Sequence, residues 1–329
     1  MRAHFWTVFP RLRHHLAPRS PQVATEAWGA LVPDPHRGAV AVSGRLRRPP
    51  GSRAAVVLVH GLGGSSQSPY VTSAAATCEA LGLATLRLDL RGSDERGSDI
   101  YHAGLTADVA AAFAAPELRA YDALHLLGFS LGGHVALRAA IEPGEPRLRS
   151  VAAVCSPLDL AVAQRSFDRP GCWPYRAYVL RRLKAIYAGV ASRAPVPTPV
   201  AEVLRVTKLR DWDRLTVVPR FGFADVDDYY ARASVGPLLP RLRVPALLVA
   251  SPGDPMVPAA CITAAAAAAA GRLRLVWVPG GGHVGFPSRV DVGAAGPPGL
   301  EGQVVSWLLS PAMTAGAADG STAREAIAR

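Results

Sequence analysis

The chain has 329 residues, half of them apolar, and this is enough to bury one sizeable hydrophobic core with room for a small second lobe. No apolar run is long enough to span a bilayer. The N-terminus starts basic, but His4, Thr7 and Pro10 interrupt any apolar signal-peptide stretch. The four cysteines show neither metal-ligand nor disulfide-framework spacing, so we expect a cytoplasmic protein that needs no metal.

The net charge of +11 is concentrated in two segments. Residues 1–53 hold nine arginines against two acidic residues, and residues 165–220 hold twelve basic residues against four acidic ones. No helix-turn-helix, zinc or aromatic-basic module accompanies this charge, so we expect no nucleic-acid partner. A solvated basic surface is one interpretation. Contact with an anionic membrane surface, or attraction of an anionic substrate, is the alternative.

Short apolar runs alternate along the chain with stretches of helical periodicity. The pattern predicts strands at residues 54–60, 84–89, 123–127, 151–156, 246–251 and 274–278. It predicts helices near residues 69–81, 106–114, 131–142, 259–270 and 299–309. Such alternation is typical of an α/β protein with a mainly parallel central sheet flanked by helices. The stretch from about residue 160 to 240 is too long for a simple loop, so we expect a helical cap insertion there.

These elements divide the chain into three parts. Residues 1–53 form a basic N-terminal arm with leading strands, and residues 54–311 form the main domain with its cap. Residues 312–329, rich in Ala, Gly and Thr, are expected to be a flexible tail. The sequence does not indicate an oligomeric state.

The first predicted strand of the main domain ends in the glycine-rich turn "HGLGGSSQSPY". Such a turn can present the backbone N–H of Leu62 to an oxyanion. A phosphate-binding glycine loop is the competing interpretation. No Lys-Ser/Thr pair follows Gly64, and the glycine spacing fits neither nucleotide-binding fingerprint, so we favour the oxyanion role.

The next distinctive segment, "LHLLGFSLGGHVALRAA", changes from a buried strand to a helix at Ser130. Glycine stands two places before and two places after this serine, as in the sharp strand-to-helix turn that exposes a nucleophilic hydroxyl. The N–H of Leu131, at the start of the helix, would be a second oxyanion donor. A GxSxG pattern also occurs by chance, and the flanking strand and helix make the functional interpretation stronger.

Two further residues complete a candidate triad. Asp254 follows one predicted strand and His283 follows the next, so both lie with Ser130 at the carboxyl edge of a parallel sheet. Their chain order, Ser–Asp–His, is the one expected for this fold. A turn-capping aspartate and a surface histidine are the alternatives for each residue alone. The aspartates of the "ADVDDYY" segment (Asp225, Asp227 and Asp228) are expected on a helix leaving the cap, not in the triad.

Seven motifs of the chain resemble, in order, those of the YheT-like branch of the α/β-hydrolase superfamily. They are "HGLGGSSQSPY", "YHAGLTADV", "GFSLGGHVAL", "SPLDL", "GFADVDDYY", "DPMVP" and "GGHVGF". Gly63 and His134 depart from the acidic residue and the asparagine that are common in that branch, which leaves the triad intact but weakens any inherited substrate preference. The resemblance implies an α/β-hydrolase fold and hydrolysis of carboxylic, often lipid-derived, esters.

The sequence thus predicts a serine esterase in which Ser130 is the nucleophile, His283 the base and Asp254 the acid, with no metal or organic cofactor. Two alternatives stay open. The same triad can transfer an acyl group to another alcohol, and a hydrolase fold can also serve as a non-catalytic binding protein. The acyl length, the leaving alcohol, and the choice between ester, thioester and amide are not fixed by the sequence.

Overall fold

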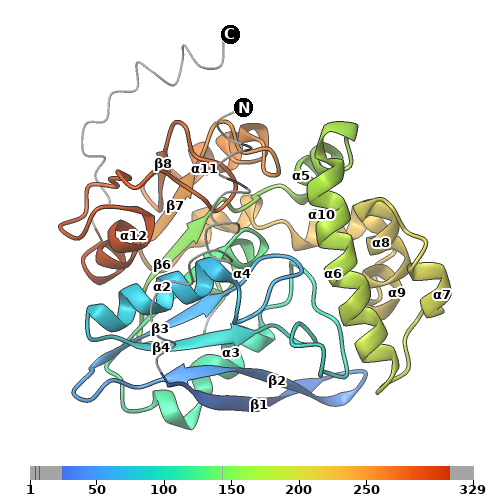
Figure 1. Ribbon diagram of the computed structural model, residues 1–329, viewed down its shortest axis with the longest axis horizontal. Coiled ribbons are helices and arrows are strands. Elements are labelled where there is room, and N and C mark those ends of the chain that lie inside the picture. Colours follow the sequence, from blue (N-terminus) through green and yellow to red (C-terminus); the bar gives the residue numbers. More distant parts are fainter. Residues whose placement is uncertain (1–3, 5–6, 8–23, 143, 312–329) are drawn as a thin grey trace.

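A computed structural model of the protein describes residues 4, 7, 24–142 and 144–311 (Figure 1). Residues 1–3, 5–6 and 8–23 of the basic arm and the whole predicted tail (residues 312–329) therefore lie outside the described residues.

The described chain forms an eight-stranded sheet with the order β1-β2-β4-β3-β5-β6-β7-β8. β1 and β2 form an antiparallel hairpin, β2 also pairs antiparallel with β4, and all the later pairs are parallel. The mainly parallel α/β sheet predicted from the sequence is confirmed. The strands are β1 (Glu26–Asp34), β2 (Gly38–Arg47), β3 (Ala54–Val59), β4 (Ala84–Asp89), β5 (Ala123–Phe129), β6 (Leu148–Val154), β7 (Ala246–Ala250) and β8 (Leu273–Trp277).

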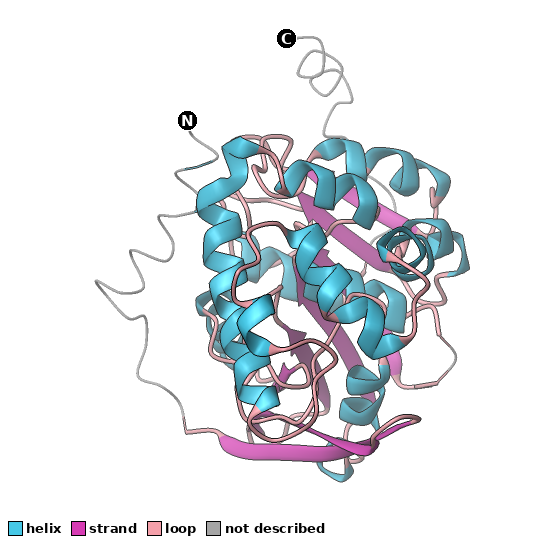
Figure 2. Ribbon diagram, turned by 90° about the vertical axis from the view of Figure 1, so that its right-hand side faces the viewer, coloured by secondary structure: helices cyan, strands magenta, loops and turns pink. Residues whose placement is uncertain are grey.

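Burial along the strands follows their place in the sheet. The central strands β3 and β7 are continuous apolar runs with almost every residue buried, because helices cover both faces of the sheet. In the hairpin strands, buried and exposed residues largely alternate, as expected for strands with one solvated face. Figure 2 shows this hairpin as the edge of the sheet, with helices on both sides of the remaining strands.

Helices α2 (Pro69–Ala80) and α12 (Leu300–Leu309) pack on one face of the sheet, where Val71 and Val304 join a core with Val56. Helices α3 (Ala107–Ala114), α4 (Leu131–Ala139) and α11 (Thr263–Ala268) pack on the other face. A 3-10 turn, η4 (Ala259–Cys261), precedes α11, so the helix predicted at 259–270 is split and shorter. In the described part of the chain, no helix combines the length and the apolar composition that a bilayer crossing requires.

The chain between β6 and β7 forms the predicted helical insertion, which packs beside the carboxyl edge of the sheet (Figure 1). Its long helix α6 turns one apolar stripe towards the core, with Val179, Leu183 and Ile186 buried. The six α-helices of this cap are α5 (Leu160–Phe167), α6 (Trp173–Ala191), α7 (Val200–Val203), α8 (Leu209–Leu215), α9 (Val217–Phe221) and α10 (Val226–Ala233).

A cluster of buried charges ties the cap to the sheet. Arg220 of α9 donates to Asp99 at 2.6 Å and to Asp34 of β1 at 3.1 Å. Arg91, after β4, pairs with Asp34 at 3.0 Å and with Asp108 of α3 at 2.8 Å. The side chains of these five residues are almost completely buried, so each charge depends on its partners for compensation.

The pKa of Asp34 shows that its hydrogen-bond and ion-pair partners outweigh the effect of burial. Burial raises it, but hydrogen bonds from the backbone N–H groups of His36 and Arg37 and from Arg220 outweigh that effect and lower the pKa to about 2. Because the folded-state pKa is depressed, the stability it contributes is present above the ordinary value of 3.8 and is lost as the pH falls towards 2.

We therefore expect Arg220→Met to lower the free energy of unfolding by roughly 3–5 kcal/mol at neutral pH, because it leaves Asp99 and Asp34 short of a buried partner. Arg214→Met, at an exposed arginine of the neighbouring α8, should change it by less than about 0.5 kcal/mol. Urea denaturation of both variants tests this. The deficit of the Arg220 variant should narrow as the pH falls from 3.8 towards 2, and equal midpoints for the two variants would contradict the role of the cluster.

Candidate active site

The structure brings the three predicted triad residues together at the carboxyl edge of the sheet. Ser130 directly follows β5, Asp254 follows β7, and His283 follows β8. Both Asp254 and His283 are buried, with 7% exposure each. Their convergence follows from the parallel pairing of β5 to β8, which directs every carboxyl end to the same edge.

Ser130 lies in a strained turn that explains the glycines on either side of it. Its φ of 52° and ψ of −123° are unusual for a residue with a side chain. A Cβ at Gly132 would come within 2.3 Å of the His60 carbonyl oxygen, and a Cβ at Gly128 within 2.2 Å of the Gly132 carbonyl oxygen. Only glycine at both positions lets α4 start directly against the ends of β3 and β5, and this turn lifts the Ser130 hydroxyl out of the sheet.

A chain of hydrogen bonds joins the three side chains. The Ser130 Oγ lies 3.0 Å from Nε2 of His283, and Nδ1 of His283 lies 2.9 Å from Oδ2 of Asp254. The other Asp254 oxygen accepts the backbone N–H groups of Met256 (2.8 Å) and Val257 (3.1 Å). Since an ionised carboxylate only accepts, Nδ1 must donate, and Nε2 of the neutral ring is then free to accept the serine proton.

Two backbone N–H groups beside Ser130 are free to donate. In the glycine turn, the N–H of Gly61 is bound by the Tyr70 hydroxyl, that of Gly63 by the Tyr101 hydroxyl, and that of Gly64 by the Gly61 carbonyl. Within the described residues, the Leu62 N–H has no acceptor. Leu131 is the first residue of α4, so its N–H has no intrahelical partner.

Neighbouring polar residues hold this turn in place. Asp89, at the end of β4, accepts both the backbone N–H and the hydroxyl of Ser66, at 2.6 and 2.8 Å. Buried His60 contacts the Gly61 carbonyl (2.8 Å) and Ser93 Oγ (2.9 Å). Asp89 and His60 therefore stabilise the loops at this edge of the sheet.

The three aspartates of the "ADVDDYY" segment lie on the cap, away from the candidate triad. Asp225 caps α10, Asp227 pairs with Arg210, and Asp228 pairs with Arg232, all on the exposed side of the cap. The predicted helical position of this cluster is correct.

Cys155 lies behind the triad, and its Sγ and the ligand atoms of Asp254 and His283 fall within 4.8 Å of one another. Burial raises the pKa of the Cys155 thiol well above its ordinary value. The thiol also donates to the Gly282 carbonyl and accepts the Val284 N–H. This set is therefore a packing contact beneath the His283 loop.

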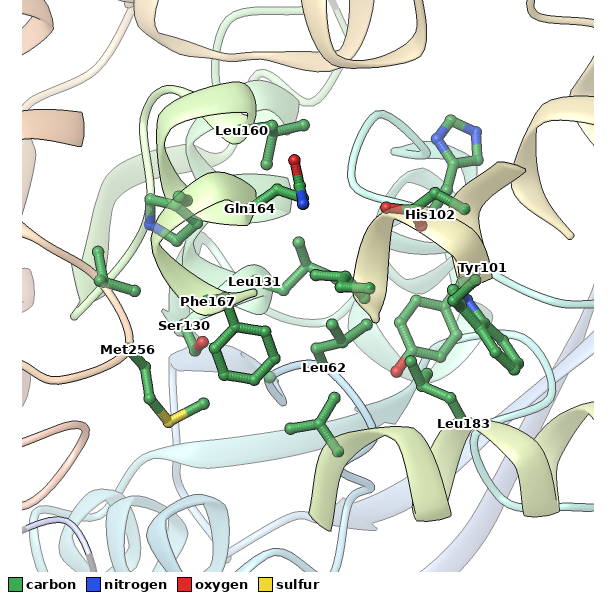
Figure 3. A pocket seen from close by; sticks show the side chains of 18 of the residues that line it. Leu62, Tyr101, His102, Ser130, Leu131, Leu160, Gln164, Phe167, Leu183 and Met256 are labelled. Atoms are coloured by element: carbon green, nitrogen blue, oxygen red, sulfur yellow. The ribbon is translucent and has the colours of Figure 1, made fainter. Parts of the chain in front are cut away.

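A largely apolar pocket opens at Ser130 and continues beneath the cap. Figure 3 places Ser130 at one side and Tyr101, His102 and Leu183 at the other, with Leu62 and Leu131 between them. Cap helix α5 contributes Leu160, Gln164 and Phe167 to its wall. The sequence did not indicate the pocket's polar lining (Tyr70, Tyr101, His102, Gln164 and Asp213), because these residues are scattered over four segments with no shared motif.

The N-terminal arm also reaches this region. The Thr7 hydroxyl accepts the backbone N–H of His283 at 2.9 Å, and the His4 ring stacks on Tyr175 of α6.

The basic residues of the cap have mixed surroundings. Arg182 pairs with Glu95 of the core at 2.9 Å, so it joins α6 to the main domain. Lys184 donates to the carbonyls of Leu204 and Val206, so it joins two segments of the cap. Arg181 is exposed on the outer face of α6, near Trp173, which is 64% exposed.

Comparisons with known proteins point to one family. A family model described as "Alpha/beta hydrolase family" matches residues 56–295. The YheT protein of Escherichia coli (strain K12) is 29% identical over 210 residues, covering 61% of this chain and 62% of that protein. Phospholipase ABHD3 of Homo sapiens is 24% identical over 250 residues, covering 71% of this chain and 59% of that protein. The chain thus spans less than two thirds of the length of these relatives.

Among solved structures, the esterase Pf2001 of Pyrococcus furiosus superposes with a TM-score of 0.52 at 16% identity, covering 79% of this chain and 85% of that one. At this identity the likeness concerns the fold. Together with the sheet order and the strained serine turn, the matches show that the chain belongs to the α/β hydrolase family.

Proposed function

We propose that the protein is a serine hydrolase that cleaves carboxylic esters with acyl or lipid-derived chains. The observation that carries the proposal is the pair of hydrogen bonds that links Ser130 to His283 and His283 to Asp254, at the mouth of an apolar pocket. A binding protein has no need of this arrangement. The phospholipase among the sequence relatives supports lipid-derived esters as the substrate class.

In the proposed reaction, Ser130 Oγ attacks the ester carbonyl carbon while Nε2 of His283 takes the hydroxyl proton. Asp254 keeps the ring in the required tautomer and stabilises the imidazolium that forms. The N–H groups of Leu62 and Leu131 donate to the oxyanion of the tetrahedral intermediate.

His283 then returns the proton to the leaving alcohol, and the acyl group stays on Ser130. A water molecule, deprotonated by His283, attacks the acyl-enzyme and releases the acid, which restores the Ser130 hydroxyl. If an alcohol replaces water, the same site transfers the acyl group. Product analysis in the presence of an acceptor alcohol distinguishes the two outcomes.

We expect a fluorophosphonate probe to label Ser130, because the probe reacts with activated serine nucleophiles. Ser130→Ala should abolish both labelling and turnover of p-nitrophenyl esters, with a loss on the order of a million-fold. Ser65→Ala, in the neighbouring glycine turn, is the matched control and should keep its labelling. Persistent labelling in the Ser130 variant, or a label mapped to another serine, would overturn the assignment. A series of acyl lengths in the same assay reports the chain that the pocket prefers.

Asp254→Asn should reduce turnover about ten-thousand-fold, because an amide at this position favours the wrong tautomer of His283. Asp227→Asn removes an exposed aspartate of the cap and should leave turnover nearly unchanged. Steady-state kinetics on one ester compares the two variants. Near-normal activity of the Asp254 variant would show that another carboxylate orients the base.

We also propose that the outer face of the cap contacts anionic lipid. Exposed Trp173 and Leu204 (49% exposed) flank a groove along α6 to which Arg181 contributes, and exposed Arg205 and Lys208 lie in the adjoining segment. An exposed aromatic ring beside arginines matches the chemistry of an anionic lipid surface. Within the described residues, Arg181, Arg205 and Lys208 form no ion pair, in contrast to Arg182.

The protein should therefore bind vesicles containing phosphatidylserine better than phosphatidylcholine vesicles, and added salt should weaken this binding. Replacing Arg181, Arg205 and Lys208 with Gln should reduce it. Replacing Arg119, Arg149 and Arg243, exposed arginines outside the cap, removes the same charge and should reduce it less. Co-sedimentation measures all three proteins. Equal binding to both vesicle types, or equal loss in the two triple variants, would contradict a cap-specific contact.

A further inference from the structure

Asp213 is a buried acid in the wall of the pocket that the proposed reaction does not use. It belongs to α8 of the cap and is 6% exposed, among the apolar lining residues Leu209, Trp212 and Val217. Its Oδ2 accepts the hydroxyl of Tyr230 at 2.6 Å. Among the described residues, its other oxygen has no hydrogen-bond partner, and no cation lies within ion-pair distance.

Three other acids of the cap have partners that compensate their charge. Asp168 accepts two backbone N–H groups and pairs with Arg176, and Asp227 and Asp228 each pair with an arginine. A buried carboxyl group with an unused acceptor reduces stability unless something binds to it. Holding α8 against α10 requires only the oxygen that Tyr230 occupies. The second oxygen is therefore available to a group that enters the pocket.

The protonation of Asp213 restricts which group fits. Burial raises its pKa to about 7, although the Tyr230 hydrogen bond opposes the shift, so the acid and the carboxylate coexist near neutral pH. A hydroxyl can donate to the carboxylate and accept from the acid. An ammonium can only donate, and its transfer into an apolar pocket carries a large desolvation cost.

We propose that Asp213 is a specificity-determining residue that binds a hydroxyl group on the substrate chain in the pocket. The preferred substrates would then be esters whose chain is apolar next to the ester bond and hydroxylated further along. This inference rests on the proposed ester hydrolysis. The hydroxyl can lie on the acyl chain or on the alcohol, and both positions offer the same chemistry to Asp213.

The test uses p-nitrophenyl esters with short, medium and long acyl chains that end in a methyl, a hydroxyl or an ammonium group. A second arm uses acetate esters of alkyl alcohols and of the matching diols, which places the hydroxyl on the leaving group. For each chain length, the ratio of kcat/KM for the hydroxyl and methyl substrates is measured. At the length that reaches Asp213, this ratio should be about tenfold or more in one of the arms.

Asp213→Leu should reduce the ratio to about one, because leucine offers no polar atom. Asp213→Asn should keep most of it, because its amide still donates to a hydroxyl. Asp227→Leu, at an exposed acid of the same cap, is the matched control and should keep the full ratio. Thermal denaturation shows whether each variant is folded, and ratios are compared only among folded proteins. Should the leucine variant not fold, Asp213→Ala, which also removes the carboxyl group, supplies the comparison and should likewise reduce the ratio to about one.

Three outcomes would overturn the proposal. The first is a ratio near one at every length in both arms. The second is a ratio that both Asp213 variants leave unchanged while their stability falls, which would make the residue structural only. The third is a preference for the ammonium substrates. Fluorophosphonate labelling of Ser130 and turnover of methyl-ended esters test the proposed hydrolysis separately, so either idea can fail without the other.

Discussion

The parallel pairing of β3 with β5 and of β5 to β8 in sequence is the constraint on which the candidate site depends. It places the turns after β3, β5, β7 and β8 along one edge, so Leu62, Ser130, Asp254 and His283 meet although more than 200 residues separate the first from the last. The close approach of α4 to this edge has its own requirement. With any side chain at Gly128 or Gly132, the helix would move away from the strand ends, and the Ser130 hydroxyl would lose its alignment with His283.

Buried charges fix the position of the cap on the sheet. The cap has an apolar underside, and the ion cluster around Arg220 gives it a defined position on the sheet, because each guanidinium and carboxylate must meet its partners. Asp34 ends strand β1 of the hairpin and Asp99 lies in the loop after β4, so the cluster joins the hairpin, the main sheet and the cap at one point. The position of the cap, which this ion cluster fixes, determines where α6 lies over the pocket.

Much of this architecture could be predicted because local patterns carried it. The strands around residues 54–60 and 84–89 and the helices near 69–81 and 106–114 agree with the structure to within about one residue, since apolar runs and helical periodicity are local signals. The helix after Ser130 ends at Ala139 instead of continuing to Glu142, and the alanine-rich segment forms a shorter helix than its composition indicated. Helix ends depend on individual hydrogen bonds, which composition does not specify.

The contacts that join distant segments could not be predicted from local sequence patterns. The pairing of Arg220 with Asp34 spans 186 residues, and no periodicity marks either of them. The polar lining of the pocket is equally scattered, and a pattern search finds Asp213 only as one charge in the polar segment "RDWDRL". The proximity of Ser130, Asp254 and His283 could be predicted because each residue follows a strand of the parallel sheet.

Asp99 and Asp213 are buried acids with different surroundings, and the difference underlies the proposed role of Asp213. Asp99 is enclosed by guanidinium groups, with both oxygens engaged, so it has nothing left to offer a ligand. Asp213 is about as deeply buried, but it meets one phenol and an apolar cavity. Around Asp99, the ion pairs with guanidinium groups offset the free-energy cost of desolvating the carboxylate. Around Asp213, part of the desolvation cost stays uncompensated until a hydrogen-bonding group binds to the free oxygen. A site of this kind can discriminate between substrates that carry such a group and substrates that lack it.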